Sequence, residues 1–192
     1  MPKVVYVTGA PAAGKSSTLR LLGEEVSRLL VWEYGVRLTE HVNLKCTQSI
    51  TQDHVRERSA GVVTPEDVAE VDEALLAFVQ ENRGAANVLI DSHPVTKESY
   101  GFRITPFSLE QFRALNPDEI WVLYASSYET RRRIKVDAGG RPMITADEAQ
   151  MHTVIQASVA ATYGMAASCP VYLFDTAAPR VELVARLAAR LA

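Results

Sequence analysis

Residues 9–17 read Gly-Ala-Pro-Ala-Ala-Gly-Lys-Ser-Ser (GAPAAGKSS), an unexpected place for glycine. Gly9 and Gly14 stand directly before Lys15 and Ser16, where the first helix of the chain is expected to begin. Glycine is the poorest helix former among the ordinary residues, because it loses the most backbone freedom on folding. The two glycines therefore indicate that this turn needs a backbone shape that other residues do not easily adopt.

The stretch lies between a predicted buried strand and a predicted helix. Val4–Val7 is a short continuous apolar run, the pattern of a strand that is covered on both faces. After the stretch, an apolar stripe predicts an amphipathic helix through Leu19, Leu22, Val26, Leu29 and Leu30. A strand, a glycine turn ending in Lys-Ser and a helix together form the phosphate-binding loop. Its glycines let successive N–H groups, with the positive end of the helix, point at an anion.

The nucleotide-binding residues are predicted to be the whole loop: Gly9, Ala10, Pro11, Ala12, Ala13, Gly14, Lys15, Ser16 and Ser17. The ammonium group of Lys15 is expected to reach the β- and γ-phosphates, and the hydroxyl of Ser16 to coordinate Mg²⁺. ATP and Mg²⁺ are therefore the predicted ligands. The alternative, a flexible glycine-rich turn without a ligand, does not explain the Lys-Ser pair.

The rest of the chain alternates strands and helices. Further buried strands are predicted at Val88–Ile90, Ile120–Tyr124 and Val171–Phe174, and a fifth strand, with thinner apolar content, at Val36–Glu40. A second helical stripe consists of Val68, Val71, Leu75, Phe78 and Val79. This alternation predicts an α/β fold of the P-loop NTPase class, a doubly wound, mostly parallel five-stranded sheet with helices on both faces. Ligands of such sheets bind beyond the carboxyl ends of the strands.

Capping signals mark three helix starts, at Thr64–Asp67, Ser126–Glu129 and Thr145–Glu148. The least regular segments are Asn43–Val63, Ser92–Pro106 and Asp137–Met143, and they are the expected movable parts of an enzyme.

Asp91 ends one of the buried strand patterns, which places a carboxylate at the carboxyl edge of the sheet beside the loop. A carboxylate in that position holds Mg²⁺, directly or through water, although it can also simply cap the following turn. His93 follows two residues later and is a candidate for substrate contact, or else a structural histidine.

Phosphoryl transfer needs positive charge around the moving group, so arginines outside the loop are expected at the site. The run Thr130–Lys135 contains three consecutive arginines, and helix geometry lets at most two of them face one ligand. Arg132 and Arg141 are the predicted catalytic arginines, against the alternative of a solvated basic helix face. Arg56 and Arg58 are candidates for gripping a second phosphate-bearing substrate, or for surface ion pairs.

The bulk composition limits the possible partners and location. The 192 residues carry a formal net charge of −3, without the basic field that attracts a nucleic-acid backbone. There is no apolar run long enough to span a bilayer and no leader pattern at the start, so a single cytoplasmic domain over residues 1–192 is expected, with no membrane partner. Cys46 and Cys169 are expected to be reduced thiols rather than a disulfide.

Six stretches together resemble the archaeal-type adenylate kinases: GAPAAGKSS (9–17), DSHPVTKESYGF (91–102), NPDEIWVL (116–123), TRRR (130–133), DEAQMH (147–152) and ATYG (161–164). The resemblance implies a nucleoside monophosphate kinase that uses ATP and Mg²⁺ with AMP as acceptor, and often a homotrimer. It implies a short lid near residues 137–143 and an acceptor-binding segment near 43–63. On this resemblance, Arg56 matches an arginine that contacts the monophosphate, whereas Arg132, Arg133 and Arg141 match lid-side arginines.

Two other functions stay open on the sequence. A kinase of a small-molecule alcohol would need a carboxylate or a histidine near the accepting hydroxyl, which would give that task to Asp91 or His93. A nucleotide-dependent switch would instead transfer phosphate only to water. The acceptor itself and the base preference are not fixed by the sequence.

Overall fold

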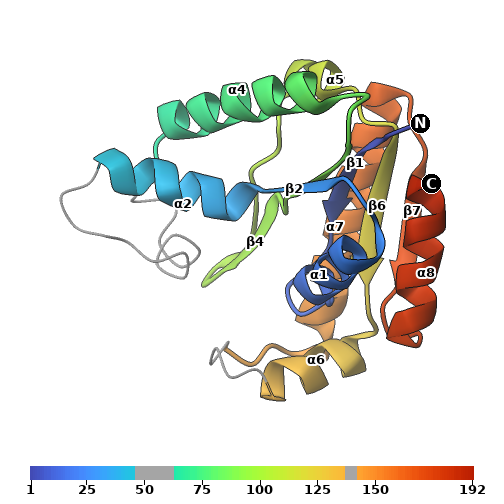
Figure 1. The fold of residues 1–192 in the computed structure, drawn as a ribbon. Helices are drawn as coiled ribbons and strands as arrows, with labels where there is room; N and C mark the ends of the chain where they lie inside the picture. The colour runs from blue at the N-terminus through green and yellow to red at the C-terminus, as the bar shows by residue number, and fades with distance from the viewer. Residues whose placement is uncertain (46–62, 137–141) are drawn as a thin grey trace.

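Five parallel strands form the central sheet of the computed structural model, in the order β2-β3-β1-β6-β7 (Figure 1). The structure describes residues 1–45, 63–136 and 142–192. The strands are β1 (Val4–Thr8), β2 (Leu29–Glu33), β3 (Asn87–Asp91), β6 (Glu119–Tyr124) and β7 (Val171–Asp175). Four of the five predicted strands and the predicted doubly wound parallel sheet are thereby confirmed.

Two apolar layers cover the sheet because side chains of β1 alternate between its faces. Val4 and Tyr6 belong to the layer under α4 (Pro65–Asn82), α5 (Leu109–Leu115) and α7 (Ala146–Ala167). Val5 and Val7 belong to the opposite layer, under α1 (Lys15–Glu25) and α8 (Arg180–Leu191) (Figure 1). With both faces buried, polar side chains can gather only at the ends of the strands.

The prediction of a strand at Val36–Glu40 is wrong. Those residues lie in α2 (Tyr34–Lys45), and the fifth strand is β2, formed by Leu29–Glu33. The prediction that the first helix extends through Leu29 and Leu30 is also wrong. Helix α1 ends at Glu25, Val26 is extended and Arg28 has a φ of 58°. A short apolar run fits a helix and a buried strand equally well, and pairing with β3 decides for the strand here.

The capping signals are confirmed at the helix starts. The side chains of Thr64 and Thr145 each accept the third backbone N–H of α4 and α7, and Asp67 and Glu148 complete the capping boxes. The hydroxyl of Ser126 accepts from the N–H of Glu129 (3.2 Å) at the start of α6 (Ser127–Val136). These starts are local, which is why the sequence predicts them well.

The segment Ser92–Pro106, predicted as irregular, contains an antiparallel hairpin of β4 (Val95–Glu98) and β5 (Gly101–Ile104). It stands apart from the main sheet, on the side of α2 (Figure 1). The hairpin is tied to α7, where the ring Nε2 of His152 lies 3.1 Å from the carbonyl oxygen of Val95. It forms one wall of the cavity described below.

Cys169 is a free, half-buried cysteine, whereas Cys46 lies outside the described residues. Across residues 1–45, 63–136 and 142–192, no helix combines the length and the apolar character that crossing a bilayer needs.

Candidate functional site

The stretch between β1 and α1 forms a tight loop that ends in an uncapped helix. Ala12 and Gly14 take positive φ angles of 60° and 85°, and the N–H of Ala13 donates to the carbonyl oxygen of Ala10 (3.1 Å). Gly14 is the N-cap residue of α1, and no side chain caps that helix end. Because the first N–H groups of a helix need partners, this end can bind an anion.

Gly9 is required by close packing rather than by its φ angle. A Cβ atom built on Gly9 would lie closer than 3.0 Å to the carbonyl oxygen of Leu123, at the end of the neighbouring strand β6. Real Cβ atoms do not approach a backbone oxygen so closely, so the loop and β6 would have to move apart. The glycine thus fixes how tightly the loop lies on the carboxyl edge of the sheet.

We therefore expect Gly9→Ala to lower the free energy of unfolding by about 1–3 kcal/mol, the usual cost of overpacking. Thermal or urea denaturation followed by circular dichroism measures this. Gly23→Ala is the matched control, because a Cβ there has nothing within 4 Å and alanine is the better helix former. If both variants were as stable as the wild type, the close approach at Leu123 would not constrain the loop.

Lys15 and Asp91 meet at this edge of the sheet. Lys15 is the first residue of α1, and Asp91 is the last residue of β3, beside Val7 of β1. Their side chains form an ion pair and are only 13% and 11% exposed. Ser16 is exposed at the start of α1. The structure thus brings Lys15 and Asp91 into contact and places Ser16 next to Lys15 in the first turn of α1.

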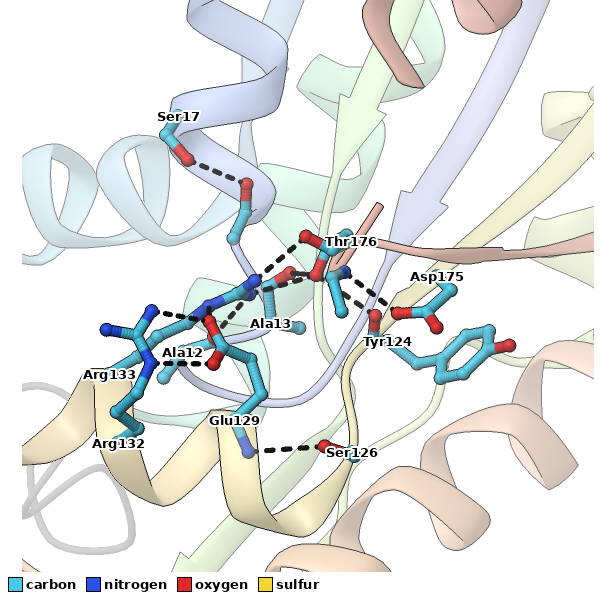
Figure 2. Close-up of polar contacts among 12 residues, drawn as sticks. Ala12, Ala13, Ser17, Tyr124, Ser126, Glu129, Arg132, Arg133, Asp175 and Thr176 are labelled. Atoms are coloured by element: carbon cyan, nitrogen blue, oxygen red, sulfur yellow. Dashed lines mark hydrogen bonds and ion pairs between the residues drawn. The ribbon is translucent and has the colours of Figure 1, made fainter. Parts of the chain in front are cut away.

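Arg133 holds the loop from the side of α6. Its Nη1 donates to the carbonyl oxygen of Ala12 (3.2 Å) and to Oγ1 of Thr176 (2.9 Å), and its Nη2 donates to the carbonyl oxygen of Thr176 (2.8 Å). The Thr176 hydroxyl also lies 2.7 Å from the carbonyl oxygen of Ala13 (Figure 2). In this state Arg133 contacts the main chain of the loop, so it shapes the anion site from outside.

Glu129 links Arg133 to its neighbour Arg132. One carboxylate oxygen accepts from Nε of Arg133 (2.8 Å), and Arg132 binds both carboxylate oxygens (2.7 and 2.8 Å) (Figure 2). These hydrogen bonds, from Arg132 first and then Arg133, lower the pKa of Glu129 to about 2. Arg132 is 56% exposed, whereas Arg133 is 19% exposed. Of these two arginines of α6, the structure brings Arg133 to the loop and leaves Arg132 at the surface.

Arg56, Arg58 and Arg141 lie outside the described residues, as does most of the predicted lid and acceptor segment. Thr176 and Glu129 were not predicted from the sequence to be partners of Arg133 at the loop. Glu129 carries a usable signal, because its position three and four residues before Arg132 and Arg133 is the spacing of a helical ion pair. Thr176 carries none, since only the fold brings it from the end of β7 to the loop.

A cavity of about 430 Å³ lies between α2, α4, the segment after β3 and the hairpin. His93 lines it, as predicted for a substrate contact, together with Ser92, the residue that follows Asp91. Tyr34, Asp72 and Arg103 line it too, and the sequence analysis did not identify them. The Tyr34 hydroxyl donates to Oδ1 of Asp72 (2.7 Å). Burial raises the pKa of Asp72 to about 6.

Within residues 1–45, 63–136 and 142–192, no group of three His, Cys, Asp or Glu side chains is arranged to hold a metal ion by itself. The two predicted cation ligands lie at the carboxyl edge of the sheet, the Ser16 hydroxyl at the start of α1 and the Asp91 carboxylate at the end of β3.

A family model described as an AAA domain matches residues 8–150, more than half of the chain. The chain belongs to this AAA-domain family. The match begins at the end of β1 and includes the loop, the residues that line the cavity and α6, whereas Thr176 lies beyond it. The AAA-domain assignment and the parallel sheet together confirm the predicted P-loop fold.

Relatives of this AAA-domain protein include two adenylate kinases. That of Thermococcus onnurineus is 27% identical over 176 residues, covering 86% of this chain and 82% of the relative. That of Pyrococcus furiosus is 25% identical over 168 residues, with the same coverage of both chains. The alignments thus run through most of each protein.

Solved structures show the same fold at lower identity. A sugar kinase from Janibacter sp. superposes with a TM-score of 0.59 at 14% identity, covering 100% of this chain and 96% of the other. A tunicamycin resistance protein from Deinococcus radiodurans gives 0.57 at 15% identity (99% and 95% covered). A deoxyadenosine kinase from M. mycoides gives 0.57 at 11% identity (98% of both). The AAA-domain protein therefore has the architecture of the P-loop kinases.

Proposed function

We propose that this protein is an ATP-dependent nucleoside monophosphate kinase of the adenylate kinase type, which converts ATP and AMP into two ADP. One observation carries the proposal: Asp91, which pairs with Lys15 at the anion loop, is followed directly in the chain by Ser92 and His93, and both of these line the cavity. A triphosphate on the loop would thus have its terminal phosphate next to a second binding site. The two adenylate kinase relatives support this assignment.

In this proposal the loop amides and Lys15 bind the phosphates of ATP. The hard oxygen ligands of Ser16 and Asp91 suit Mg²⁺, which would neutralise phosphate charge when bound. Asp91 is then shared between the cation and Lys15. A phosphate acceptor has a second pKa near 6 and is already ionised at pH 7, so the protein needs no general base.

The arginines complete the proposed site. Arg132 is placed on α6 with its guanidinium at the surface, from where a side-chain rotation could carry it to the transferring group. Arg141 is proposed to bring positive charge to the transferring phosphate as well. Arg56 is proposed to bind the phosphate of the acceptor, and His93 is proposed to contact the acceptor. The adenylate kinase resemblance also predicts a homotrimer, and light scattering of the purified protein measures the oligomeric state.

The decisive experiment is a coupled assay of ADP release with ATP, Mg²⁺ and a panel of acceptors. We expect AMP, or another nucleoside monophosphate, to raise turnover far above the rate with water alone. Small alcohols belong in the same panel, because turnover with an alcohol alone would identify the second kind of kinase. A panel in which every acceptor matched the water rate would contradict the proposal and favour a switch NTPase.

Arg133→Lys tests how the loop is held. The ammonium group of lysine cannot replace the forked contacts to Ala12 and Thr176, so the loop amides lose their support. We expect the KM for ATP to rise about 10-fold, the equivalent of one or two hydrogen bonds, with a smaller change in kcat. Arg131→Lys, in the same run of α6, is the control. Equal KM values in both variants would mean that Arg133 does not position the loop.

A further inference from the structure

One ionisable side chain in the cavity has no part in holding ATP. Asp72, on α4, is only 4% exposed and lines the cavity. Its carboxylate accepts the Tyr34 hydroxyl, and among the described residues no lysine or arginine forms an ion pair with it. A carboxylate offers about four acceptor positions, so the hydrogen bond from Tyr34 leaves others that an occupant of the cavity can use. Such a buried carboxylate favours any occupant of the cavity that donates hydrogen bonds.

The charge state of Asp72 limits which chemical groups of a ligand can bind beside it. Burial raises its pKa to about 6, with the Tyr34 hydrogen bond acting in the opposite direction. At a pH of about 7.5 the group is therefore mainly ionised, and an ionised carboxylate accepts hydrogen bonds but donates none. It would be repelled by a carbonyl oxygen of a ligand and attracted by an amino group.

The walls around Asp72 are aromatic and apolar and suit a flat ring. The Tyr34 ring meets the edge of Phe107 with centroids 5.5 Å apart and planes at 86°. The N–H of Phe107 in turn donates to the Tyr163 hydroxyl (2.7 Å). Leu38, Val68 and Pro106 supply further apolar surface to the cavity. An aromatic ring with polar edges fits such a site, because its faces lie on apolar walls and its edge meets the carboxylate.

The position of Asp72 within the cavity gives the orientation of the ligand. Ser92 and His93 line the cavity and directly follow Asp91, which pairs with Lys15 where phosphate chemistry is expected. Asp72 comes from a different element, α4, whereas Lys15 and Asp91 come from α1 and β3. An acceptor with its phosphate toward Asp91 would therefore present its base to Asp72.

We propose that Asp72, positioned by Tyr34, is a specificity residue that accepts a hydrogen bond from the exocyclic amino group of the acceptor's nucleobase. The residue would select adenine and cytosine nucleotides over the matching keto nucleotides, in which an oxygen replaces that amino group and the N–H donor lies on the adjacent ring nitrogen, N1 or N3, instead. This inference rests on the proposed function, since it concerns the acceptor of the same reaction.

The test uses two matched pairs of acceptors, AMP with IMP and CMP with UMP, each pair exchanging an amino group for a keto oxygen. For the wild-type protein with ATP and Mg²⁺, we expect kcat/KM to favour the amino member of each usable pair by about 10- to 100-fold, the usual effect of leaving a buried polar group unpaired. This ratio depends on no variant, so it tests the inference even if a substitution prevents folding.

Asp72→Asn then assigns the preference to this residue. An amide both donates and accepts, so we expect the amino/keto ratio to fall at least about fivefold, while the KM for ATP stays unchanged. Tyr34→Phe, which removes the hydrogen bond that orients Asp72, should lower the ratio in part. Glu73→Gln, the next residue of α4 and exposed, is the control and should keep the wild-type ratio.

The outcomes separate the two proposals. Transfer to monophosphates with equal kcat/KM for AMP and IMP, and for CMP and UMP, would overturn the role of Asp72 and leave the kinase assignment standing. An unchanged ratio in a folded Asp72→Asn protein would do the same. Failure of the wild type to phosphorylate any of the four monophosphates would overturn the kinase assignment, and the role of Asp72 with it.

Discussion

Lys15→Met is expected to reduce kcat/KM for phosphoryl transfer by about 100- to 1,000-fold, the scale observed when one preorganised charged or hydrogen-bonding group is removed from a transition state. The side chain of Lys15 is 13% exposed and stands at the first turn of α1, where the loop amides converge. Methionine keeps the length and the apolar stem of lysine but carries no charge. Steady-state kinetics with ATP and the best monophosphate acceptor measure the loss.

The loss of activity in Lys15→Met is expected because the ammonium group neutralises both the phosphates and the Asp91 carboxylate. In the structure the ammonium group pairs with the Asp91 carboxylate, so its removal leaves that half-buried acid without its cation. Repulsion between Asp91 and the phosphates should then weaken ATP binding too, which equilibrium titration with a fluorescent ATP analogue can show. Added Mg²⁺ should recover part of the binding, because a divalent cation can replace the lost positive charge beside Asp91.

Arg20→Met is the matched control for Lys15→Met. Arg20 lies on the same helix, is 65% exposed and pairs with the exposed Glu24. Its loss should leave kinetics and ATP affinity unchanged, since exposed ion pairs contribute little. Wild-type activity in Lys15→Met would contradict the role of the loop, and with it the assignment as a kinase.

The parts of the site that could be predicted from the sequence are those that local spacing determines. The loop needs Gly9, Gly14, Lys15 and Ser16 in one short stretch, and the backbone angles of the structure explain the second glycine directly. Asp91 was predictable because it ends an apolar run, and parallel strands bring their carboxyl ends to one edge. Helix starts were predictable from capping residues that contact their own first turn.

The parts that could not be predicted depend on contacts between distant segments. Leu29–Glu33 became a strand only because β3 offers it a pairing edge, and the helix pattern of the preceding residues gave no warning. Thr176 reaches the loop through the order of strands in the sheet. Asp72 has the sequence context of an ordinary helical acid, and only the packing of α4 against α2 buries it beside Tyr34.

Glu119→Gln is expected to lower the free energy of unfolding by about 2–4 kcal/mol, the cost of breaking a largely buried charged network. Glu119 begins β6 at the end of the sheet opposite the loop and is 5% exposed. Its carboxylate accepts from Nζ of Lys3 (2.7 Å), from Nε of Arg190 (2.8 Å) and from Nε1 of Trp121 (2.8 Å). The Trp121 side chain is fully buried, so its N–H has no access to water as a substitute partner.

Two features keep the expected decrease in unfolding free energy below that caused by breaking a fully buried ion pair. The side chains of Lys3 and Arg190 are 31% and 29% exposed, so water can solvate them after the carboxylate is lost. Arg190 also lies over the ring of Tyr172, 3.6 Å from its centroid, and keeps that contact. Urea denaturation of both proteins at pH 7 gives the difference, and Glu24→Gln, at an exposed pair, should change stability by less than about 0.5 kcal/mol.

The pH dependence of the Glu119 contribution distinguishes lost charge from lost shape. Burial alone would raise the pKa of Glu119, but the hydrogen bonds from Arg190, Lys3 and Trp121 outweigh burial and hold its pKa below the ordinary value. A carboxyl whose pKa is lower in the folded state stabilises the fold above its unfolded pKa of about 4.3, and this stabilisation is lost as the pH falls through the folded value. The stability gap between wild type and Glu119→Gln should therefore be constant from pH 7 to about pH 5 and narrow below about pH 4. A gap that stayed the same in acid would show that the shape of the side chain, and not its charge, stabilises this end of the sheet.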